Sequence, residues 1–276
     1  SIILYFFTAN YFNYYHPALK SLMDATCSPK HGWFESVAES YAQRRPHYPA
    51  SLFSWISNKA SNHQRCWDCA CGSGQASLGL AKHFAQVEAT DLSPSQIASA
   101  PAHPRIRYQI AAAEDSRLPA ASMDTIVVAA AIHWLDVPRF NEEALRVIRP
   151  GGLMIWVGYD PPQGAPTKLQ SWLDQLYGDR LQDWWPPQRQ HVDVHYTDLP
   201  FPAASQSLPQ DLCISLQWGC DDLLGFIETW SAMRKASQEG HDLRPKLNIE
   251  LQELWPAEQT IPLTLPLMGR WGYLAR

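Results

Sequence analysis

The segment from Asp68 to Gly74 and the isolated Asp91 carry residue types that can bind a nucleoside. Gly72 and Gly74 follow an apolar run typical of a strand and precede a helical pattern. Glycines at such a junction let the backbone approach a ligand closely, and the start of the helix adds a favourable dipole. Asp91 stands seventeen positions after Gly74, at the end of the next predicted strand, where a carboxylate can accept hydrogen bonds from both ribose hydroxyls. Together the two features predict a nucleoside-containing ligand.

The same loop discriminates between two kinds of nucleoside ligand. The dinucleotide fingerprint G-x-G-x-x-G fails, because Ser77 stands three positions after Gly74. Asp68 would repel the phosphates of a dinucleotide, but it suits the ammonium group of a methionyl tail. The residues therefore favour S-adenosylmethionine, whose product is S-adenosylhomocysteine, and a nicotinamide-dependent oxidoreductase is the first alternative function.

Methyl transfer is an in-line displacement, so the protein's main tasks are to align the acceptor and to exclude water. An ionised carboxylate acceptor needs no base, whereas a hydroxyl group needs a proton removed. His133, just past the fourth predicted strand, is the candidate catalytic base, since the usual imidazole pKa of about 6.5 suits proton transfer. Trp134 beside it is a candidate wall of the substrate pocket. The alternative is that both residues form a structural corner between strand and helix.

Two further pairs of residues are candidates for contact with the acceptor. Trp230 and Arg234 share one face of a helical pattern, and Arg234 can hold a carboxylate bidentately. Equally, the two form one packing stripe with a charged edge. Trp184 and Trp185 lie in the stretch 160–211, which is rich in Pro, Gln and Trp and weakly periodic. Such an insertion is either a lid over the substrate or an excursion that covers the sheet.

The elements that position these residues alternate between short apolar runs and helical patterns. This alternation predicts parallel strands joined by right-handed crossovers. Near the C-terminus, residues 260–267 and 271–276 are separated by Met268-Gly269-Arg270 and predict a closing antiparallel hairpin. The predicted strands are 65–70, 87–91, 105–110, 123–131 and 153–159, and the predicted helices are 34–41, 49–56, 75–84, a short stretch from Pro94, 140–148 and 221–235.

Five segments occur in an order and spacing typical of one enzyme family: WDCACGSGQ, EATDLSPSQI, AAEDSRLP, SMDTIVVAAAIHW and LRVIRPGG. Over about residues 33–158 the chain resembles the class I S-adenosylmethionine-dependent methyltransferases of type 11. The segments FESVAESYAQRRPHYP and IHWLD are similar to the subgroup of trans-aconitate methyltransferase-like enzymes. The resemblance implies a Rossmann-like α/β fold with a mostly parallel seven-stranded sheet, helices on both faces and the C-terminal hairpin. Ala70 stands where the family pattern D-x-G-x-G-x-G has its first glycine.

The resemblance implies cofactor-binding roles for the residues at the first two strands. Asp68 is expected near the methionyl amino group, and Gly72 and Gly74 present their backbone to the cofactor. Asp91 is expected to bind the ribose, with Leu92 against the adenine. Structural alternatives are that Asp68 caps the loop and that Asp91 is the N-cap of the helix after it.

The resemblance also implies roles for residues later and earlier in the chain. Ala113 and Glu114 are expected at the adenine edge and Ala130 near the methionyl moiety. Tyr41 and Arg45 are expected to cover the cofactor from the N-terminal helix. Alternatively, Glu114 is a solvated loop acid, and Tyr41 and Arg45 are ordinary packing or surface residues.

Composition bounds the class of protein. The chain has 276 residues, 46% of them hydrophobic, which is enough for one α/β domain with insertions. Its net charge of −5, without a basic block, disfavours a nucleic-acid partner. Six cysteines include the Cys66-x-x-Cys69 spacing, but a second such pair that would complete a zinc site is missing. We therefore expect no metal and no nucleic acid.

We expect an N-terminal extension at residues 1–32 and a single methyltransferase domain at 33–276. Within that domain, residues 33–158 are expected to bind the cofactor and 159–235 to form a substrate-side cap. The opening apolar stretch lacks the basic region of a signal peptide and is too short and polar to span a bilayer. Whether residues 1–22 are native stays open.

The expected function is methyl transfer from S-adenosylmethionine to a carboxylate or hydroxyl group of a small molecule. We expect a cytoplasmic monomer or homodimer without a membrane partner. A non-catalytic module that binds S-adenosylmethionine or a protein partner is the second alternative.

Overall fold

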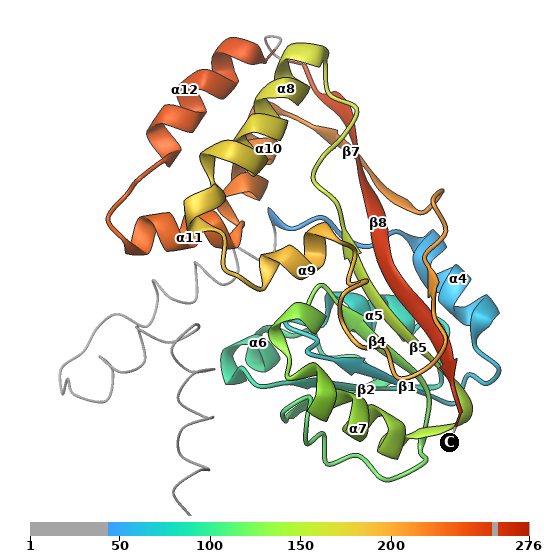
Figure 1. The fold of residues 1–276 in the computed structure, drawn as a ribbon. Coiled ribbons are helices and arrows are strands. Elements are labelled where there is room, and N and C mark those ends of the chain that lie inside the picture. The colour runs from blue at the N-terminus through green and yellow to red at the C-terminus, as the bar shows by residue number, and fades with distance from the viewer. Residues whose placement is uncertain (1–43, 256–258, 276) are drawn as a thin grey trace, which may run out of the picture. The chain divides into compact units, whose positions relative to one another are not determined.

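The computed structural model describes residues 44–255 and 259–275. The expected N-terminal extension at 1–32, the predicted helix at 34–41 and Tyr41 lie outside these residues. Figure 1 shows a sheet flanked by helices and, beyond one end of its central strands, a second group of helices. This arrangement confirms the predicted α/β class.

The predicted strand–helix alternation forms the centre of the sheet (Figure 1). Its parallel strands pair in the order β3-β2-β1-β4-β5. The β-branched strand β4 is almost wholly buried because it lies between β1 and β5 and is covered on both faces. The strands are β1 (Arg65–Cys69), β2 (Gln86–Asp91), β3 (Ile106–Ile110), β4 (Met123–Ala129) and β5 (Ile148–Tyr159).

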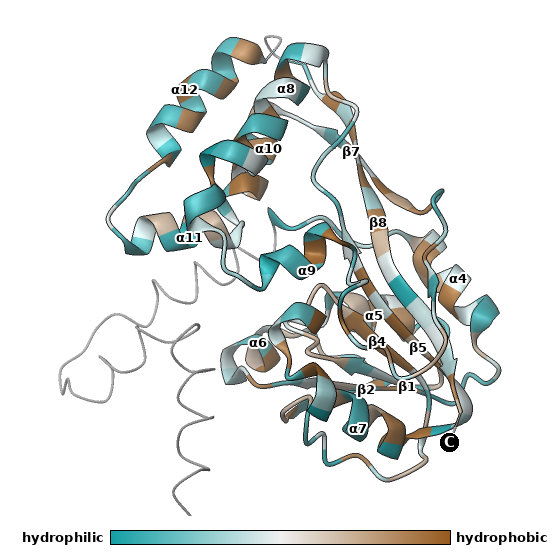
Figure 2. Ribbon diagram, in the orientation of Figure 1, coloured by the Kyte–Doolittle hydropathy of each residue, from teal (hydrophilic) through white to brown (hydrophobic). Residues whose placement is uncertain are grey.

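Two sets of helices cover the two faces of this sheet. Side chains of β1 alternate between them: Cys66 joins the core beneath α4 (Ala50–Lys59) and α5 (Gln75–Leu80), whereas Trp67 joins the core beneath α7 (Val137–Val147). In Figure 2 the central strands carry mostly hydrophobic colours and the outer helix faces hydrophilic ones. The carboxyl ends of the strands therefore form one edge at which the following loops meet.

The predicted C-terminal hairpin is wrong in detail, because residues 261–274 form one continuous strand. β8 (Ile261–Leu274) runs antiparallel to β5. Gly269 makes no turn: a Cβ atom there would collide with the backbone of Trp156, so the glycine permits close approach of the two strands.

Two further antiparallel strands pair with β8. β6 (Gln206–Ser207) pairs with the C-terminal half of β8, and β7 (Cys213–Trp218) pairs with its N-terminal half. The sheet formed by the described strands therefore has eight strands instead of the predicted seven: β3-β2-β1-β4-β5-β8-β6, with β7 also paired to β8. The two predicted hairpin strands are one strand, and β6 and β7 were not predicted.

The second group of helices contains parts of the chain that periodicity described poorly. The predicted helix at 221–235 is two helices, α10 (Cys220–Glu228) and α11 (Ser231–Gln238). α10 ends at Glu228 with Thr229 as its C-cap, and the extended backbone of Trp230, the N-cap of α11, separates the two helices. The segments of this group outside the prediction are α8 (Thr167–Gln175), η2 (Leu176–Arg180), η3 (Gln182–Trp184), α9 (Arg189–Asp193) and α12 (Arg244–Leu254).

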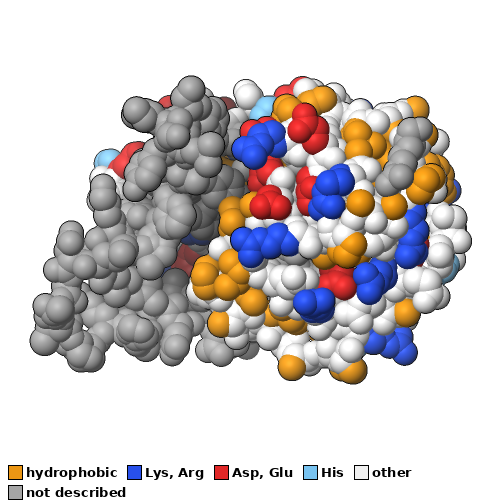
Figure 3. Space-filling view, turned by 90° about the horizontal axis from the view of Figure 1, so that it is seen from below, with side chains coloured by type: hydrophobic (Ala, Val, Ile, Leu, Met, Phe, Trp, Pro, Cys, Tyr) orange, Lys and Arg blue, Asp and Glu red, His pale blue; other side chains and the backbone are white. Residues whose placement is uncertain are grey.

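The surface in Figure 3 intersperses basic and acidic side chains and shows no extended area of one charge. Within the described residues, none of the helices has the length and apolar content needed to cross a bilayer. The same part of the chain contains no cluster of three or more His, Cys, Asp or Glu side chains arranged to hold a metal ion.

Candidate active site

The loop between β1 and α5 holds three residues in the left-handed region of backbone space. The φ angle is 54° at Ala70, 55° at Gly72 and 81° at Gly74. Gly74 has a second constraint, since a Cβ atom would collide with the ring of Tyr108. A Cβ atom at Gly72 would meet only Oε1 of Gln96, at 3.8 Å. The loop therefore leaves its backbone accessible at Gly72, as close approach of a ligand requires.

We expect Ala70→Gly to raise the free energy of unfolding by about 0.5–1 kcal/mol. An L-residue in the left-handed region costs about 1–2 kcal/mol, whereas glycine costs about 0.5–1 kcal/mol in chain entropy. Urea unfolding measures the difference. Ala131→Gly is the matched control, because Ala131 has a φ of −130° and should only lose stability. An Ala70→Gly protein less stable than the parent would contradict the expectation.

Asp68 is fully buried beneath this loop (0% exposed). Its Oδ2 accepts a hydrogen bond of 2.5 Å from the hydroxyl of Ser77 on α5, so its contact is with the helix rather than with the loop. Its Oδ1 is buried and makes no hydrogen bond within the described chain. Burial raises the pKa of this carboxyl to about 7, against the lowering effect of the Ser77 bond. A buried carboxylate with an unsatisfied oxygen is suited to receive a ligand's ammonium group.

Asp91 lies at the end of β2, beside the same loop. Its Oδ2 accepts a hydrogen bond of 2.9 Å from the backbone N–H of Gly72, and its Oδ1 accepts one of 2.8 Å from Ser93. The N-cap of α6 (Pro94–Ser99) is Ser93 itself, whose hydroxyl accepts from the backbone of Gln96. Asp91 therefore joins the two loops at the sheet edge, and the adjacent Leu92 is 44% exposed, as a face that contacts adenine would be.

The predicted adenine-edge residues lie beyond β3. Ala113 is buried. Glu114 is not a freely solvated acid, because its Oε1 accepts a hydrogen bond of 2.9 Å from the backbone N–H of Asp136. This bond ties Glu114 to the start of α7, where Asp136 is the N-cap. Recognition of the adenine by Ala113 and Glu114 stays a prediction.

The segment after β4 carries Ala130, His133 and Trp134. Ala130 has a φ of 53°, and its N–H donates to the carbonyl of Val157 at 2.7 Å. The ring of His133 lies 4.8 Å from that of Trp134 and stacks on Tyr196 at 6.1 Å. Burial, aided by the charges of Arg189, His191 and Arg45, lowers the pKa of His133 to about 3. Its imidazole is therefore neutral at pH 7 and a weak base, and its catalytic role stays a prediction.

Arg45 and Trp230, one predicted to cover the cofactor and one to contact the acceptor, lie at one aromatic cluster. The cluster is formed by Tyr159, Tyr177, Trp185, Phe226 and Trp230. Arg45 donates to the hydroxyl of Tyr159 and to the carbonyl of Thr229, both at 3.1 Å.

Trp230 is 7% exposed and packs inside this aromatic cluster. Arg234 is exposed on the first turn of α11, which follows Trp230. A buried Trp230 and an exposed Arg234 agree with the alternative in which the two residues form a packing stripe with a charged edge. Trp184 lies outside the cluster, with its ring 5.7 Å from that of His241.

Sequence reasoning missed Tyr196, which contacts His133, and Arg189, which lies on the helix packed against residues 132–134. Arg189 is the charge that acts most strongly on the imidazole, and Tyr196 stacks on it. Both belong to the insertion whose tryptophans suggested a substrate lid. The signal that pointed there was the composition of the insertion, not a motif.

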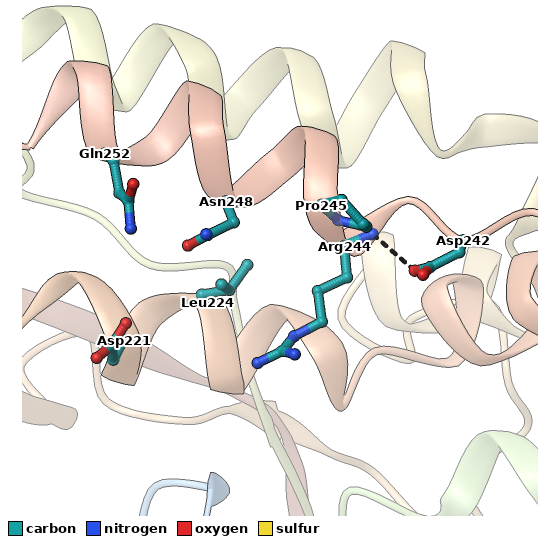
Figure 4. Close-up of a pocket in the computed structure, with 7 residues that line it drawn as sticks. All are labelled: Asp221, Leu224, Asp242, Arg244, Pro245, Asn248 and Gln252. Atoms are coloured by element: carbon teal, nitrogen blue, oxygen red, sulfur yellow. Dashed lines mark hydrogen bonds between the residues drawn. The ribbon is translucent and has the colours of Figure 1, made fainter.

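A hollow of about 280 Å³ between α10 and α12 is a different feature of the molecule (Figure 4). It contains none of the predicted site residues. Figure 4 shows Asn248 and Leu224 facing each other across it and the backbone N–H of Arg244 bonded to Asp242. The candidate site is therefore the edge of the sheet rather than this hollow.

Comparison with known proteins identifies the family of the chain. Residues 67–156 match the family model of the methyltransferase domain. A provisionally named methyltransferase of Dictyostelium discoideum is 30% identical over 78% of this chain and 82% of its own length. A solved structure of a provisionally named type II methyltransferase from Anaeromyxobacter dehalogenans is 39% identical, and the match covers 84% of this chain and 99% of that one, with a TM-score of 0.76. An uncharacterised methyltransferase of Mycobacterium tuberculosis is 32% identical over 54% of this chain and 62% of its own length.

The chain belongs to the class I S-adenosylmethionine-dependent methyltransferases. Its cofactor is S-adenosylmethionine, and the residues at the sheet edge fit this group. Asp68 offers a buried carboxylate oxygen that has no hydrogen-bond partner among the described residues, and Gly72 offers an open backbone. Of the three functions open from the sequence, methyl transfer is therefore the supported one.

Proposed function

We propose that the chain methylates a small molecule at a carboxylate or hydroxyl oxygen. The observation that carries this proposal is the aromatic cluster, which lies where the helices after β5 meet the sheet edge. Tyr159 ends β5, and Arg45 links it to the end of α10 through hydrogen bonds to Tyr159 and Thr229. Aromatic walls beside a few charged groups are typical of sites for small organic ligands.

Within this proposal the chain divides its tasks between two segments. Residues 33–158 bind the cofactor. Asp68 pairs with the methionyl ammonium group and Asp91 binds the ribose, while Gly72 and Gly74 bring the backbone against the cofactor. Residues 159–235 cover the acceptor and exclude water, which aligns the reacting groups and protects them from solvent.

When bound, S-adenosylmethionine supplies an electrophilic methyl group: the bond from acceptor oxygen to methyl carbon forms as the carbon–sulfur bond breaks, and the electron pair stays on sulfur. A carboxylate acceptor releases no proton in this exchange, whereas a hydroxyl acceptor releases one. His133 with its lowered pKa suits the first acceptor better than the second.

A thermal-shift titration with S-adenosylmethionine, S-adenosylhomocysteine and NAD⁺ in parallel tests the cofactor part. A ligand at about 100 times its Kd should add about 2.7 kcal/mol, which is several degrees for a domain of this size. We expect shifts with the two adenosyl ligands alone. A shift with NAD⁺ alone, or with none of the three, would contradict the proposal.

Formation of S-adenosylhomocysteine in the presence of small carboxylic acids and alcohols tests the acceptor part. Turnover with at least one of them is the expected outcome. Tight binding of S-adenosylhomocysteine without turnover on any of these acceptors would favour the non-catalytic binding module instead.

A further inference from the structure

Arg189 is a largely buried cation beside two rings of the aromatic cluster, Tyr177 and Trp185. It is the first residue of α9, and its side chain is 14% exposed. The centre of its guanidinium group lies 4.8 Å from the ring centroid of Tyr177 and 5.3 Å from that of Trp185. Such stacking fixes the plane of the guanidinium group and leaves its edge of N–H donors directed past the rings.

The charge of Arg189 is only partly balanced. Its Nη1 lies 2.9 Å from Oδ1 of Asp193, yet this buried Nη1 makes no hydrogen bond of good geometry within the described chain. Asp193 is itself half exposed and also accepts a hydrogen bond from the hydroxyl of Tyr177. The second nearby carboxylate, Asp160, is hydrogen-bonded to His195 at 2.9 Å. A largely buried guanidinium group whose charge is incompletely paired can bind an additional anion.

Arg189 belongs to a helix that packs against the segment after β4, because α9 contacts residues 132–134. Together with burial, the charge of Arg189 lowers the pKa of His133. The ring of Tyr196 stacks on that of His133 at 6.1 Å. His133 follows β4 and Tyr159 ends β5, so both belong to the same edge of the sheet as Asp68 and Asp91. The ring of Tyr48 lies 6.1 Å from that of Tyr159, and burial together with the charges of Tyr159, Tyr196 and Asp68 raises the pKa of the Tyr48 hydroxyl well above its usual value. The aromatic cluster and the cofactor residues thus share one region.

We propose that Arg189 is the residue that selects the acceptor, by pairing with a carboxylate on a small molecule whose apolar part packs on Tyr177, Trp185 and Trp230. A permanent cation in this position repels amine acceptors and attracts anions. The neighbouring neutral His133 is a poor proton acceptor, which suits a nucleophile that is already ionised. This inference rests on the proposed function and names its substrate class.

The test measures binding rather than turnover. Protein saturated with S-adenosylhomocysteine is titrated with benzoate, trans-cinnamate and hexanoate and, in parallel, with benzamide, cinnamamide and hexanamide. We expect at least one carboxylate to bind at least about tenfold more tightly than its amide. Arg189→Gln should remove that preference, because the charge-assisted hydrogen bond to the carboxylate is lost. Arg189→Lys should keep part of it.

Arg180→Gln is the matched control variant. Arg180 also stacks on a tryptophan, Trp172 at 5.9 Å, and is paired with Glu250, but His133 and Tyr196 are not among its partners. This variant should keep the preference for the carboxylate. Equal binding of acids and amides, binding of no acid, or an unchanged preference in Arg189→Gln would overturn the inference. Failure of S-adenosylhomocysteine itself to bind would instead contradict the proposed function.

Discussion

Asp91→Ala is expected to lower the affinity for S-adenosylhomocysteine by at least about tenfold. The change removes a carboxylate that can accept charge-assisted bonds from the ribose, each worth about 1.5–3 kcal/mol. It also releases the backbone N–H groups of Gly72 and Ser93, which Asp91 holds at 2.9 and 2.8 Å. Loss of these bonds loosens the cradle as well as the ribose contact, so the effect should exceed that of one hydrogen bond. Calorimetric titration with S-adenosylhomocysteine measures it.

Two variants separate the ribose contact from the support of the loop. Asp91→Asn keeps an acceptor oxygen for one backbone N–H but loses the charge, so its affinity should lie between those of the parent and Asp91→Ala. Asp222→Ala removes a carboxylate that accepts a 2.9 Å bond from the backbone of Gly219 at the start of α10. That variant should lose about 1 kcal/mol of stability and keep its affinity. A folded Asp91→Ala protein with unchanged affinity would remove Asp91 from the site.

The cofactor half of the site could be predicted because its determinants are local. Asp68, Gly72 and Gly74 lie on one strand–loop–helix junction, and the sheet register places Asp91 beside it. Backbone conformation and strand order are properties that short sequence patterns encode well. The structural alternative for Asp91, that it caps the following helix, is wrong, because Ser93 is the N-cap of α6.

The acceptor half could not be predicted because it depends on contacts between distant segments. Tyr177, Trp185 and Arg189 belong to one stretch of the insertion, but Trp230 packs on the two rings from beyond α10. Tyr196 likewise stacks on the distant His133, and no periodic pattern connects these residues. Trp230 shows the same limit: helical spacing predicted one helix through it, but packing against Phe226 and Trp185 accompanies a break there.

The C-terminal strand shows how a local signal is overridden by tertiary contacts. A glycine between two apolar runs is typical of a hairpin turn. At Gly269 the small residue instead allows β8 to pass close to the backbone of Trp156 on β5. The long strand that results pairs with β5 at one end and β7 at the other, and so connects the cofactor-binding sheet with the helices after β5.

The affinity for S-adenosylhomocysteine is expected to fall as the pH is lowered from 7.5 to 5.5. Burial raises the pKa of Asp68 to about 7, and only its ionised form can pair with the ligand's ammonium group. Below pH 7, binding must first remove the proton, so the affinity should fall towards tenfold per pH unit. His133, whose pKa is lowered to about 3, does not titrate in this range. Calorimetry across the pH series measures the slope.

The raised pKa of Asp68 predicts the opposite pH dependence for the stability of the free protein, which should fall as the pH is raised. Because the folded state holds the proton of Asp68 more tightly than the unfolded chain, whose carboxyl has a pKa near 3.8, this group contributes most stability below that value. The contribution is lost as the pH rises through about 7. Asp68→Asn should therefore be at least as stable as the parent at pH 8, while it binds S-adenosylhomocysteine at least about tenfold more weakly.

Ser77→Ala discriminates between titration of Asp68 and titration of another group. The Ser77 hydroxyl donates to Asp68 and lowers the pKa of its carboxyl, so removal of this donor should shift the affinity profile to higher pH. Asp68→Asn should flatten the profile over the same range, because its side chain carries no proton to lose. A profile that keeps its midpoint in Ser77→Ala and its slope in Asp68→Asn would assign the pH dependence to a different residue and leave Asp68 without a role in holding the ammonium group.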